Sequence, residues 1–282
     1  MSALVEFSNG LAAAVERAGR GIVAVHARPR TPSSGVLWRS GVVVTTDHTT
    51  ERDEEITVTL PGGETVAATL QGRDPSTDLA VLKLPVETGT AEVADAPLQV
   101  GHMALALGRG VTAALGVISS LDGAWRTWRG GSVDRFIRLD VAIYHGFSGG
   151  ALVTADGRIA GVNTSALARG AAVAIPVETV NRVVDDLLRH GRVARGYLGV
   201  GMQPVRGGVI VLSVEPDSPA ARGGLLVGDV LVAIDESAVR DTDDVQAVLD
   251  PSRVGKTVPV RVIRAGAEAG LSITIGERPK GA

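Results

Sequence analysis

The sequence predicts a mostly β fold, with two small antiparallel β-barrels followed by a separate, compact α/β domain. Between residues 21 and 174, short segments rich in β-branched residues alternate with turn residues such as PSS, PGG and DPST. About a dozen strands without intervening helices are typical of an antiparallel barrel or sandwich. Beyond residue 196, strands and helices are mixed. A length of 282 residues is also long for one compact domain, which favours two.

The first domain is expected to begin with a short helix and to end with a longer one. Residues 6–20 carry an amphipathic pattern, with Leu11, Val15 and Ala18 on one side. The strands expected between the helices are GIVAVHA, SGVVVTT, EITVTL, TVAATL, LAVLKL, MALALG, FIRLDV, ALVT, RIAGVNT and AAVAIP. Roughly 155 residues of such strands suit two small barrels packed together. The segment PVETVNRVVDDLLRHG then shows a helical period and ends at Gly191.

The second domain follows a short linker, RVARG. Its expected order is the strand GVIVLSV, the short helix SPAARGG, the strand DVLVAI, the helix DTDDVQAVLD, and the strands TVPVRVIR and GLSITIGE. We therefore expect residues 1–190 to form the first domain, N-terminal helix included, and residues 196–278 to form the second.

Composition and charge exclude several classes of protein. Hydrophobic residues make up 45% and charged residues 21% of the chain, as in a folded soluble protein and unlike a disordered one. The net charge of −3 gives no electrostatic reason to expect nucleic-acid binding. Because the chain has no cysteine, disulfides, a thiolate nucleophile and cysteine-ligated metals are excluded. We expect no metal and no cofactor.

Two further features of the sequence predict where in the cell the protein is located. The chain has no run of about 18 apolar residues, so we expect no membrane-spanning helix. The first residues, MSALVEFSNG, lack the basic and then apolar stretches of a secretory signal. We therefore expect a cytoplasmic protein, or a periplasmic one if a leader has been removed.

The segment GFSGGALV places a serine, Ser148, among glycines between two expected strands. Glycines let the backbone turn sharply, so the N–H groups of Gly146, Phe147 and Ser148 can point into one cavity beside the serine hydroxyl. Such a group of donors is an oxyanion hole. A glycine-rich hairpin without catalytic function is the alternative, and this spacing alone does not decide between them.

A serine hydroxyl needs a base to become a nucleophile, and the base needs a carboxylate to orient it. His48 closes the apolar strand SGVVVTTDH, and Asp78 directly precedes the buried strand LAVLKL, where an ionised carboxylate needs a partner. His48, Asp78 and Ser148 follow the chain order of the chymotrypsin-type catalytic triad. The other four histidines are more often surface or packing residues: His26, His102, His145 and His190.

The segment DHTTERDEEITVTLPGGETVAATLQGRDPSTDLAVLKL and the motif GFSGG resemble the HtrA family of PDZ-containing serine proteases. The resemblance implies a chymotrypsin-like fold in which His48 is the general base, Asp78 orients it, and Ser148 attacks the substrate. It rests on His48, on Gly72, Asp74, Thr77, Asp78 and residues 79–83, and on residues 146–150.

The resemblance also implies a substrate class and a role in protein quality control. Unfolded or damaged proteins are expected to be cut after small or aliphatic residues through an acyl-enzyme. The residues expected to form the specificity pocket are Ile143, Tyr144, Thr164 and Ala166.

Three features depart from the family pattern. Phe147 replaces the commoner Asn before the nucleophile, where only the backbone N–H is expected to act, so function should survive. Ala151 replaces the usual Pro after the motif. The loop ARPRTPSSG is short, which argues against assembly into large cages. A smaller homo-oligomer, a trimer, is expected instead.

The second domain also resembles the family at two motifs. Residues Tyr197, Leu198, Gly199 and Val200 look like the PDZ loop whose backbone N–H groups bind the carboxylate at a peptide C-terminus. The run SPAARGGLLVGDVLVAI matches the pattern that follows. The resemblance thus implies C-terminal peptides as partners. The alternative to an enzyme is a catalytically silent PDZ scaffold or chaperone, which the three filled triad positions argue against.

The loop AWRTWRGGSVDRF has two interpretations. Trp125 and Trp128, with Arg126 and Arg129, could form a stacking patch for nucleic acid. In an acidic chain without another basic surface, we favour a loop beside the active site that packs on the PDZ domain or on a neighbouring subunit, and we expect no nucleic-acid partner.

Overall fold

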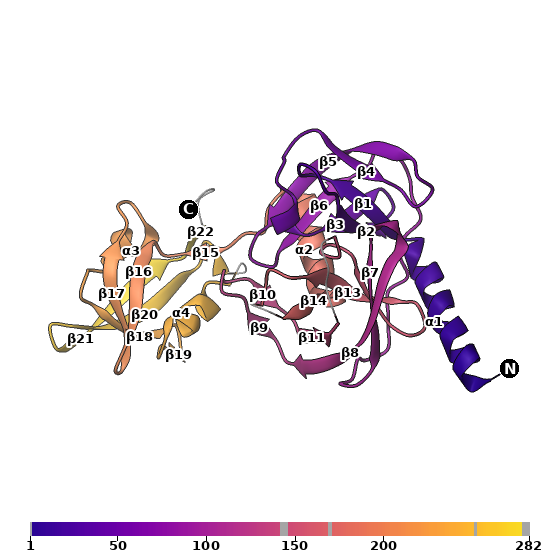
Figure 1. The fold of residues 1–282 in the computed structure, drawn as a ribbon. Helices are drawn as coiled ribbons and strands as arrows, with labels where there is room; N and C mark the ends of the chain where they lie inside the picture. Colours follow the sequence, from indigo (N-terminus) through magenta and orange to yellow (C-terminus); the bar gives the residue numbers. More distant parts are fainter. Residues whose placement is uncertain (1, 142–145, 169–170, 251–252, 278–282) are drawn as a thin grey trace. The chain divides into compact units, whose positions relative to one another are not determined.

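The structure, a computed structural model, describes residues 2–141, 146–168, 171–250 and 253–277. The chain divides into two compact units, Met1–Val193 and Ala194–Ala282 (Figure 1). Within the described residues, the first unit holds two closed barrels of antiparallel strands, and the second holds a six-stranded sheet and two helices. The mostly β fold predicted from the sequence is confirmed.

The first barrel follows the N-terminal helix α1 (Ala3–Gly19), whose Ala14 and Ala18 are buried and whose first residues are exposed. The barrel order is β1-β2-β3-β6-β5-β4. Its core is filled with valine and leucine, side chains that fit a pleated, buried surface. The strands are β1 (Ile22–His26), β2 (Ser33–Arg39), β3 (Val42–Thr45), β4 (Ile56–Thr59), β5 (Thr65–Asp74) and β6 (Leu79–Lys83), with the short helix η1 (Asp47–Thr49) after β3.

The second barrel has the order β11-β14-β13-β12-β7-β8. Its strands are β7 (Met103–Gly108), β8 (Thr112–Asp122), β11 (Phe136–Asp140), β12 (Ala151–Val153), β13 (Ile159–Thr164) and β14 (Ala172–Pro176), with the short helix η2 (Arg109–Val111) after β7. Two short strands, β9 (Trp125–Arg126) and β10 (Ser132–Val133), pair with each other outside the barrel.

The helix α2 (Val177–His190) packs on both barrels, against β5 and β6 of the first and β13 and β14 of the second. Its buried face carries the helical spacing predicted from the sequence, with Val180, Val183, Val184 and Leu187. Gly191 ends the helix with φ of +69°, a conformation that glycine adopts at little cost.

The second unit has the predicted order of strands and helices. Its sheet order is β16-β17-β18-β20-β21, so β16 forms an edge, and α4 lies next to β16. The elements are β15 (Gly196–Tyr197), β16 (Val200–Val205), β17 (Gly208–Val214), α3 (Pro219–Arg222), β18 (Val230–Ile234), β19 (Ser237–Ala238), α4 (Thr242–Val248), β20 (Thr257–Arg264), β21 (Ala267–Thr274) and β22 (Gly276–Glu277).

Two features are absent from the described residues. No helix among them is long and apolar enough to cross a membrane. No group of three or more His, Asp or Glu side chains among them is arranged to hold a metal ion.

Candidate active site

Ser148 lies in a loop that packs closely against two strands. Gly149 has φ of +85°, and a Cβ atom there would lie 2.1 Å from the carbonyl oxygen of Ser34 on β2. A Cβ atom on Gly150 would lie 2.0 Å from the carbonyl oxygen of Leu107 on β7. Both glycines after the serine are therefore required by close packing, a constraint that a free hairpin would not impose.

The backbone around Ser148 has its carbonyls paired and two N–H groups unpaired. Ser34 donates its backbone N–H to the carbonyl oxygen of Ser148 at 3.2 Å, and its hydroxyl donates to the carbonyl oxygen of Gly146. Among the residues that the structure describes, nothing accepts from the N–H groups of Gly146 and Ser148. The side chain of Phe147 is buried. N–H groups left without an internal acceptor are what an oxyanion hole requires.

His48 and Asp78 meet because the strands next to them are paired. His48 lies in η1, directly after β3, and Asp78 lies directly before β6, and β3 pairs with β6 through Thr45 and Ala80. His48 Nδ1 lies 2.8 Å from Oδ2 and 3.0 Å from Oδ1 of Asp78. The backbone N–H of His48 donates to Oδ1 at 2.9 Å. The carboxylate thus holds both the ring and the backbone of the histidine.

Asp78 is almost fully buried, at 2% exposure, and needs several donors to offset the loss of water. A further donor is the hydroxyl of Thr164, which donates to Oδ2. Thr164 is fully buried at the end of β13. The sequence analysis placed Thr164 in the specificity pocket; in the structure its hydroxyl donates to the orienting carboxylate and the residue has no exposed surface.

The Ser148 hydroxyl has a neighbour that the sequence analysis did not identify. Its Oγ lies 3.2 Å from the Oγ of Ser165, and within the described part of the chain it makes no hydrogen bond to His48. A serine–histidine hydrogen bond is often long before substrate binds, so this geometry is compatible with catalysis. The next residue, Ala166, is exposed. Ile143 and Tyr144, also expected in the specificity pocket, lie outside the described residues.

Arg73 holds the loop that carries His48. Its guanidinium donates to the carbonyl oxygens of Thr50 and Arg52, the latter at 3.0 Å, and to the carboxylate of Asp53. It also lies 3.8 Å from Asp47, the residue before His48. Partial burial raises the pKa of Asp47 above its usual range, and the Asp78 carboxylate adds to the rise, while Arg73 opposes it.

In the second unit, the residues Tyr197–Val200 form a tight loop at the start of the edge strand β16. Gly199 has φ of +75°, and a Cβ atom there would lie 2.3 Å from Cβ of Ser218. Leu198 is buried in the core of the unit. Among the described residues, nothing accepts from the N–H groups of Leu198 and Gly199. This is the arrangement that a carboxylate-binding loop needs.

Comparison with known proteins gives the same two parts. Residues 33–162 match the trypsin-like peptidase domain family, and residues 196–275 match the PDZ domain family. Serine endoprotease DegS of Escherichia coli is 34% identical over 284 aligned residues, which cover 89% of this chain and 78% of DegS. The chain belongs to the HtrA family of serine endoproteases. The HtrA membership predicted from the sequence is confirmed, and the relatives do not support a catalytically silent scaffold.

Other HtrA proteins match this chain with similar sequence identity. A protein of Halomonas elongata named probable periplasmic serine endoprotease DegP-like is 33% identical, and the match covers 89% of this chain and 57% of that protein. The solved structure of the HtrA-type protease AlgW with a decapeptide is 30% identical, with a TM-score of 0.80, and the match covers 95% of this chain and 99% of that one. A serine endoprotease from Yersinia pestis has the same TM-score at 33% identity, with 94% and 97% covered.

The tryptophan and arginine loop of this HtrA chain packs against the turn that leads to Asp78. Thr127 donates its hydroxyl to the carbonyl oxygen of Ser76 at 2.7 Å. Arg129 lies over the ring of Trp128, with 4.6 Å from its guanidinium carbon to the ring centre. Trp125 makes an edge-to-face contact with Phe136, with ring centres 5.3 Å apart. The loop therefore lies next to the turn that carries Asp78 of the candidate site.

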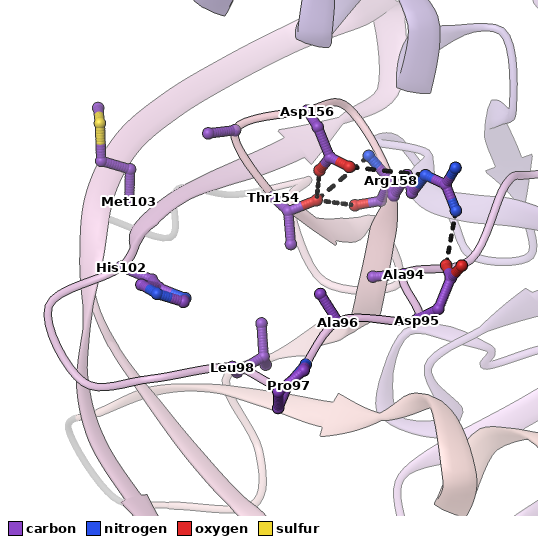
Figure 2. A pocket seen from close by; sticks show the side chains of 11 residues that line it. Ala94, Asp95, Ala96, Pro97, Leu98, His102, Met103, Thr154, Asp156 and Arg158 are labelled. Carbon is purple, nitrogen blue, oxygen red and sulfur yellow. Dashed lines mark hydrogen bonds and ion pairs between the residues drawn. The ribbon is translucent and has the colours of Figure 1, made fainter.

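A cavity of about 500 Å³ lies elsewhere in the protease unit, between the segment 94–103 and the turn 154–158 (Figure 2). No triad residue lines it. Figure 2 shows Arg158 between two carboxylates, and it pairs with Asp95 at 2.6 Å and with Asp156 at 3.5 Å. Asp95, Asp156 and Arg158 together carry one net negative charge, since one guanidinium pairs with two carboxylates.

Several contacts around the site were not predicted from the sequence. Ser34 and Gly146 are 112 positions apart, and Thr164 and Asp78 are 86 positions apart. Neither pair lies within a local motif, so only the closed barrels bring its members together. One signal was present for Arg73, which stands between two of the motif residues used for the resemblance, Gly72 and Asp74.

Proposed function

We propose that His48, Asp78 and Ser148 are the catalytic triad with which this protein hydrolyses peptide bonds. The observation that carries the proposal is the buried carboxylate of Asp78, which lies within hydrogen-bond distance of both the ring Nδ1 and the backbone N–H of His48. With Nδ1–H directed at Asp78, the opposite ring nitrogen, Nε2, is the acceptor that takes the proton of Ser148.

The reaction runs through an acyl-enzyme. Ser148 Oγ attacks the carbonyl carbon of the substrate while its proton passes to His48 Nε2. The loop of Gly146, Phe147 and Ser148 offers its N–H groups to the oxyanion that forms. The protonated histidine then gives its proton to the leaving amine as the C–N bond breaks. A water molecule, deprotonated by His48, hydrolyses the ester and frees Ser148. These steps need no metal and no cofactor.

The proposed substrates are unfolded or damaged proteins, cut after small or aliphatic residues, which gives the protein a role in protein quality control. The relationship to endoproteases supports protein substrates in general. Ala166 supports the preference, because this exposed, small side chain follows Ser165, the hydrogen-bond partner of Ser148. Ile143 and Tyr144 are proposed to complete the pocket.

The PDZ unit is proposed to bind peptide C-termini at Tyr197, Leu198, Gly199 and Val200, within a domain of residues 196–278. The N–H groups of Leu198 and Gly199, which have no acceptor among the described residues, support a bound carboxylate. Strand β16 lies at the edge of the sheet, where a bound peptide would add a strand. The protease domain is then residues 1–190.

Three further properties of the whole protein are proposed: its location, its assembly and its partners. Relatives from Halomonas and Brucella carry the word periplasmic in their names. We therefore propose the periplasm as the location, in place of the cytoplasm that the sequence analysis favoured. We also propose that the protein forms a homo-oligomer, a trimer. Nucleic acid is not among its proposed partners.

Single replacement of the triad residues tests the proposal. Ser148→Ala, His48→Ala and Asp78→Ala should each lower casein degradation by at least about a thousandfold, because a nucleophile and its base act as one unit. Ser119→Ala is a matched control, since the hydroxyl of this exposed serine donates to the carbonyl oxygen of Arg138 and to no other group among the described residues. Circular dichroism should show the same fold in all variants. A Ser148→Ala protein that kept most of its proteolysis would contradict the assignment.

A further inference from the structure

We propose that Ser34 is a positioning residue that holds the oxyanion loop in its working conformation. The proposal rests on the assignment of Ser148 as nucleophile and of the N–H groups of Gly146 and Ser148 as oxyanion donors. Ser34 lies on β2 in the first barrel, whereas Ser148 follows the second barrel's β11 and precedes its β12. Ser34 is fully buried. It therefore connects the two barrels at the site of reaction without touching the substrate.

Every polar group of Ser34 is used in this connection. Its backbone N–H donates to the carbonyl oxygen of Ser148 at 3.2 Å, and its hydroxyl donates to the carbonyl oxygen of Gly146. The same hydroxyl accepts the backbone N–H of Arg109 at 2.7 Å. The carbonyl oxygen of Ser34 accepts the hydroxyl of Thr45, also at 2.7 Å. Ser34 is thus itself held in place by Arg109 and Thr45, in addition to its two bonds to the loop.

The loop needs such an anchor because of its composition. Gly146 has φ of +102° and Gly149 has φ of +85°, and glycine has more backbone freedom than any other residue. A loop rich in glycine does not hold its N–H groups in one direction by itself. Ser34 fixes the carbonyl oxygens of Gly146 and Ser148. The N–H groups of these same two residues have no partner within the described residues. Fixed donors are what makes an oxyanion hole effective.

The neighbouring residue shows that burial alone does not explain the serine. Ser33 is also fully buried on β2, but its hydroxyl has no hydrogen-bond partner in the described part of the chain. Ser33 and Ser34 therefore have the same size, strand and burial, and they differ in whether the hydroxyl reaches the loop. This pair separates a loss of positioning from a loss of packing.

The experiment compares Ser34→Ala with Ser33→Ala on a small chromogenic peptide amide with valine at the cleaved position. We expect Ser34→Ala to lower kcat by about 10- to 100-fold, less than or similar to the loss of an oxyanion donor itself, with KM within about twofold. A peptide boronic acid, which forms a tetrahedral adduct with the nucleophile, should bind the variant more weakly by a similar factor. Ser33→Ala should keep the kcat of the unmodified protein.

A second variant covers the case in which Ser34→Ala does not fold. Ser34→Thr keeps the hydroxyl and should retain a kcat within about fivefold of the unmodified protein, which corresponds to a loss of about one hydrogen bond at most. An unchanged kcat for Ser34→Ala, an equal loss for Ser33→Ala, or a tenfold or larger loss for Ser34→Thr in a folded protein would each overturn the proposal. Ser148→Ala in the same assay separates the two assignments: if that variant stays active, the proposed nucleophile is wrong.

Discussion

At the scale of single residues, Thr164 changes how the triad is understood. Its buried hydroxyl donates to Oδ2 of Asp78, the oxygen that also lies 2.8 Å from His48 Nδ1. A buried carboxylate needs several donors to offset the loss of water, and these donors hold it in one orientation. In the proposed triad, Thr164 would therefore act on the base through Asp78, which is a different role from selecting the substrate side chain.

This role predicts the effect of Thr164→Val, which keeps the shape of the side chain and removes the hydroxyl. Loss of one hydrogen bond to a charged group should lower kcat/KM by about tenfold. The loss should be equal for substrates with alanine, valine or leucine at the cleaved position, because the pocket is unchanged. A loss that differed strongly among the three substrates would return Thr164 to the specificity pocket.

Thr179→Val is the matched control for this experiment. Thr179 is also a fully buried threonine whose hydroxyl donates to a carboxylate, that of Asp134 at 2.6 Å. This pair joins α2 to the segment before β11 and includes no triad residue. The variant should therefore lose stability without a change in kcat/KM.

The contacts of Ser34 and Thr164 also show what could not be predicted about single residues from the sequence. His48, Asp78 and Ser148 could be selected as candidates because each stands in a short, recognisable segment. The contacts of Ser34 with Gly146 and of Thr164 with Asp78 could not be predicted, because these partners come close only in the folded barrels. A serine or threonine in a strand has no local feature that reveals a partner about a hundred positions away.

At the scale of secondary structure, the sequence analysis was accurate where a hydrophobic period was long. The helix α2 and the strands β17, β18, β20 and β21 were all predicted from such periods. The two-residue strands β9 and β10 were not, because a pair of residues carries no period. They pair within the loop that carries Trp125, and Thr127 of the same loop donates its hydroxyl to the carbonyl oxygen of Ser76.

An ion pair within the second unit predicts a pH dependence of stability. Arg264 on β20 donates two hydrogen bonds to the buried Asp229, at 2.7 and 2.8 Å, and these hold the pKa of the Asp229 carboxyl below its usual range. A carboxyl whose pKa is lowered in the folded state stabilises the protein above its unfolded pKa, about 3.9. This stabilisation should therefore be lost as pH falls below about 4 and toward the folded pKa.

Asp229→Asn should remove that contribution at neutral pH, at a cost of about 2 kcal/mol. Hydrogen exchange in the full chain, followed for residues 194–277, measures the free energy of unfolding of this unit. Asp235→Asn is the control, because its pair with Arg253 is about a third exposed on both sides and should contribute no more than about 1 kcal/mol. The effect of Asp229→Asn should shrink as the pH is lowered to 3, and a constant difference from pH 7 to pH 3 would contradict the ionic explanation.

At the scale of the whole molecule, the N-terminal helix favours self-association. Leu4, Val5 and Phe7 of α1 are exposed, with Leu4 at 74%, and Figure 1 shows this end of the helix extending from the barrels. Apolar side chains on such an end gain stability when another surface covers them. Light scattering at micromolar concentration should give about three times the chain mass of 28.9 kDa. Phe7→Glu should lower that mass, and a monomer in the unmodified protein would exclude the trimer.

The last prediction concerns how the PDZ unit affects proteolysis. If a bound C-terminal peptide changes the protease site, it should change the turnover of a small chromogenic substrate that does not reach the PDZ groove. Coupling of this kind is typically about 1–3 kcal/mol, or roughly a 5- to 150-fold change in affinity. If the PDZ unit only tethers substrates, the peptide should slow cleavage of unfolded proteins by competition and leave the small substrate unaffected.

The peptide loop itself supplies the variant that makes this test specific. A methyl group on Gly199 would lie 2.3 Å from Cβ of Ser218, so Gly199→Ala should distort the carboxylate loop and abolish both peptide binding and its effect on turnover. Gly207→Ala is the control, because Gly207 also has a positive φ, +91°, but has open space around it. Peptides with a free C-terminal carboxylate should bind more tightly than their amidated versions, since the loop offers N–H donors to a negative charge. Equal binding of the two forms would show that Tyr197–Val200 do not hold a carboxylate, whatever the effect on turnover.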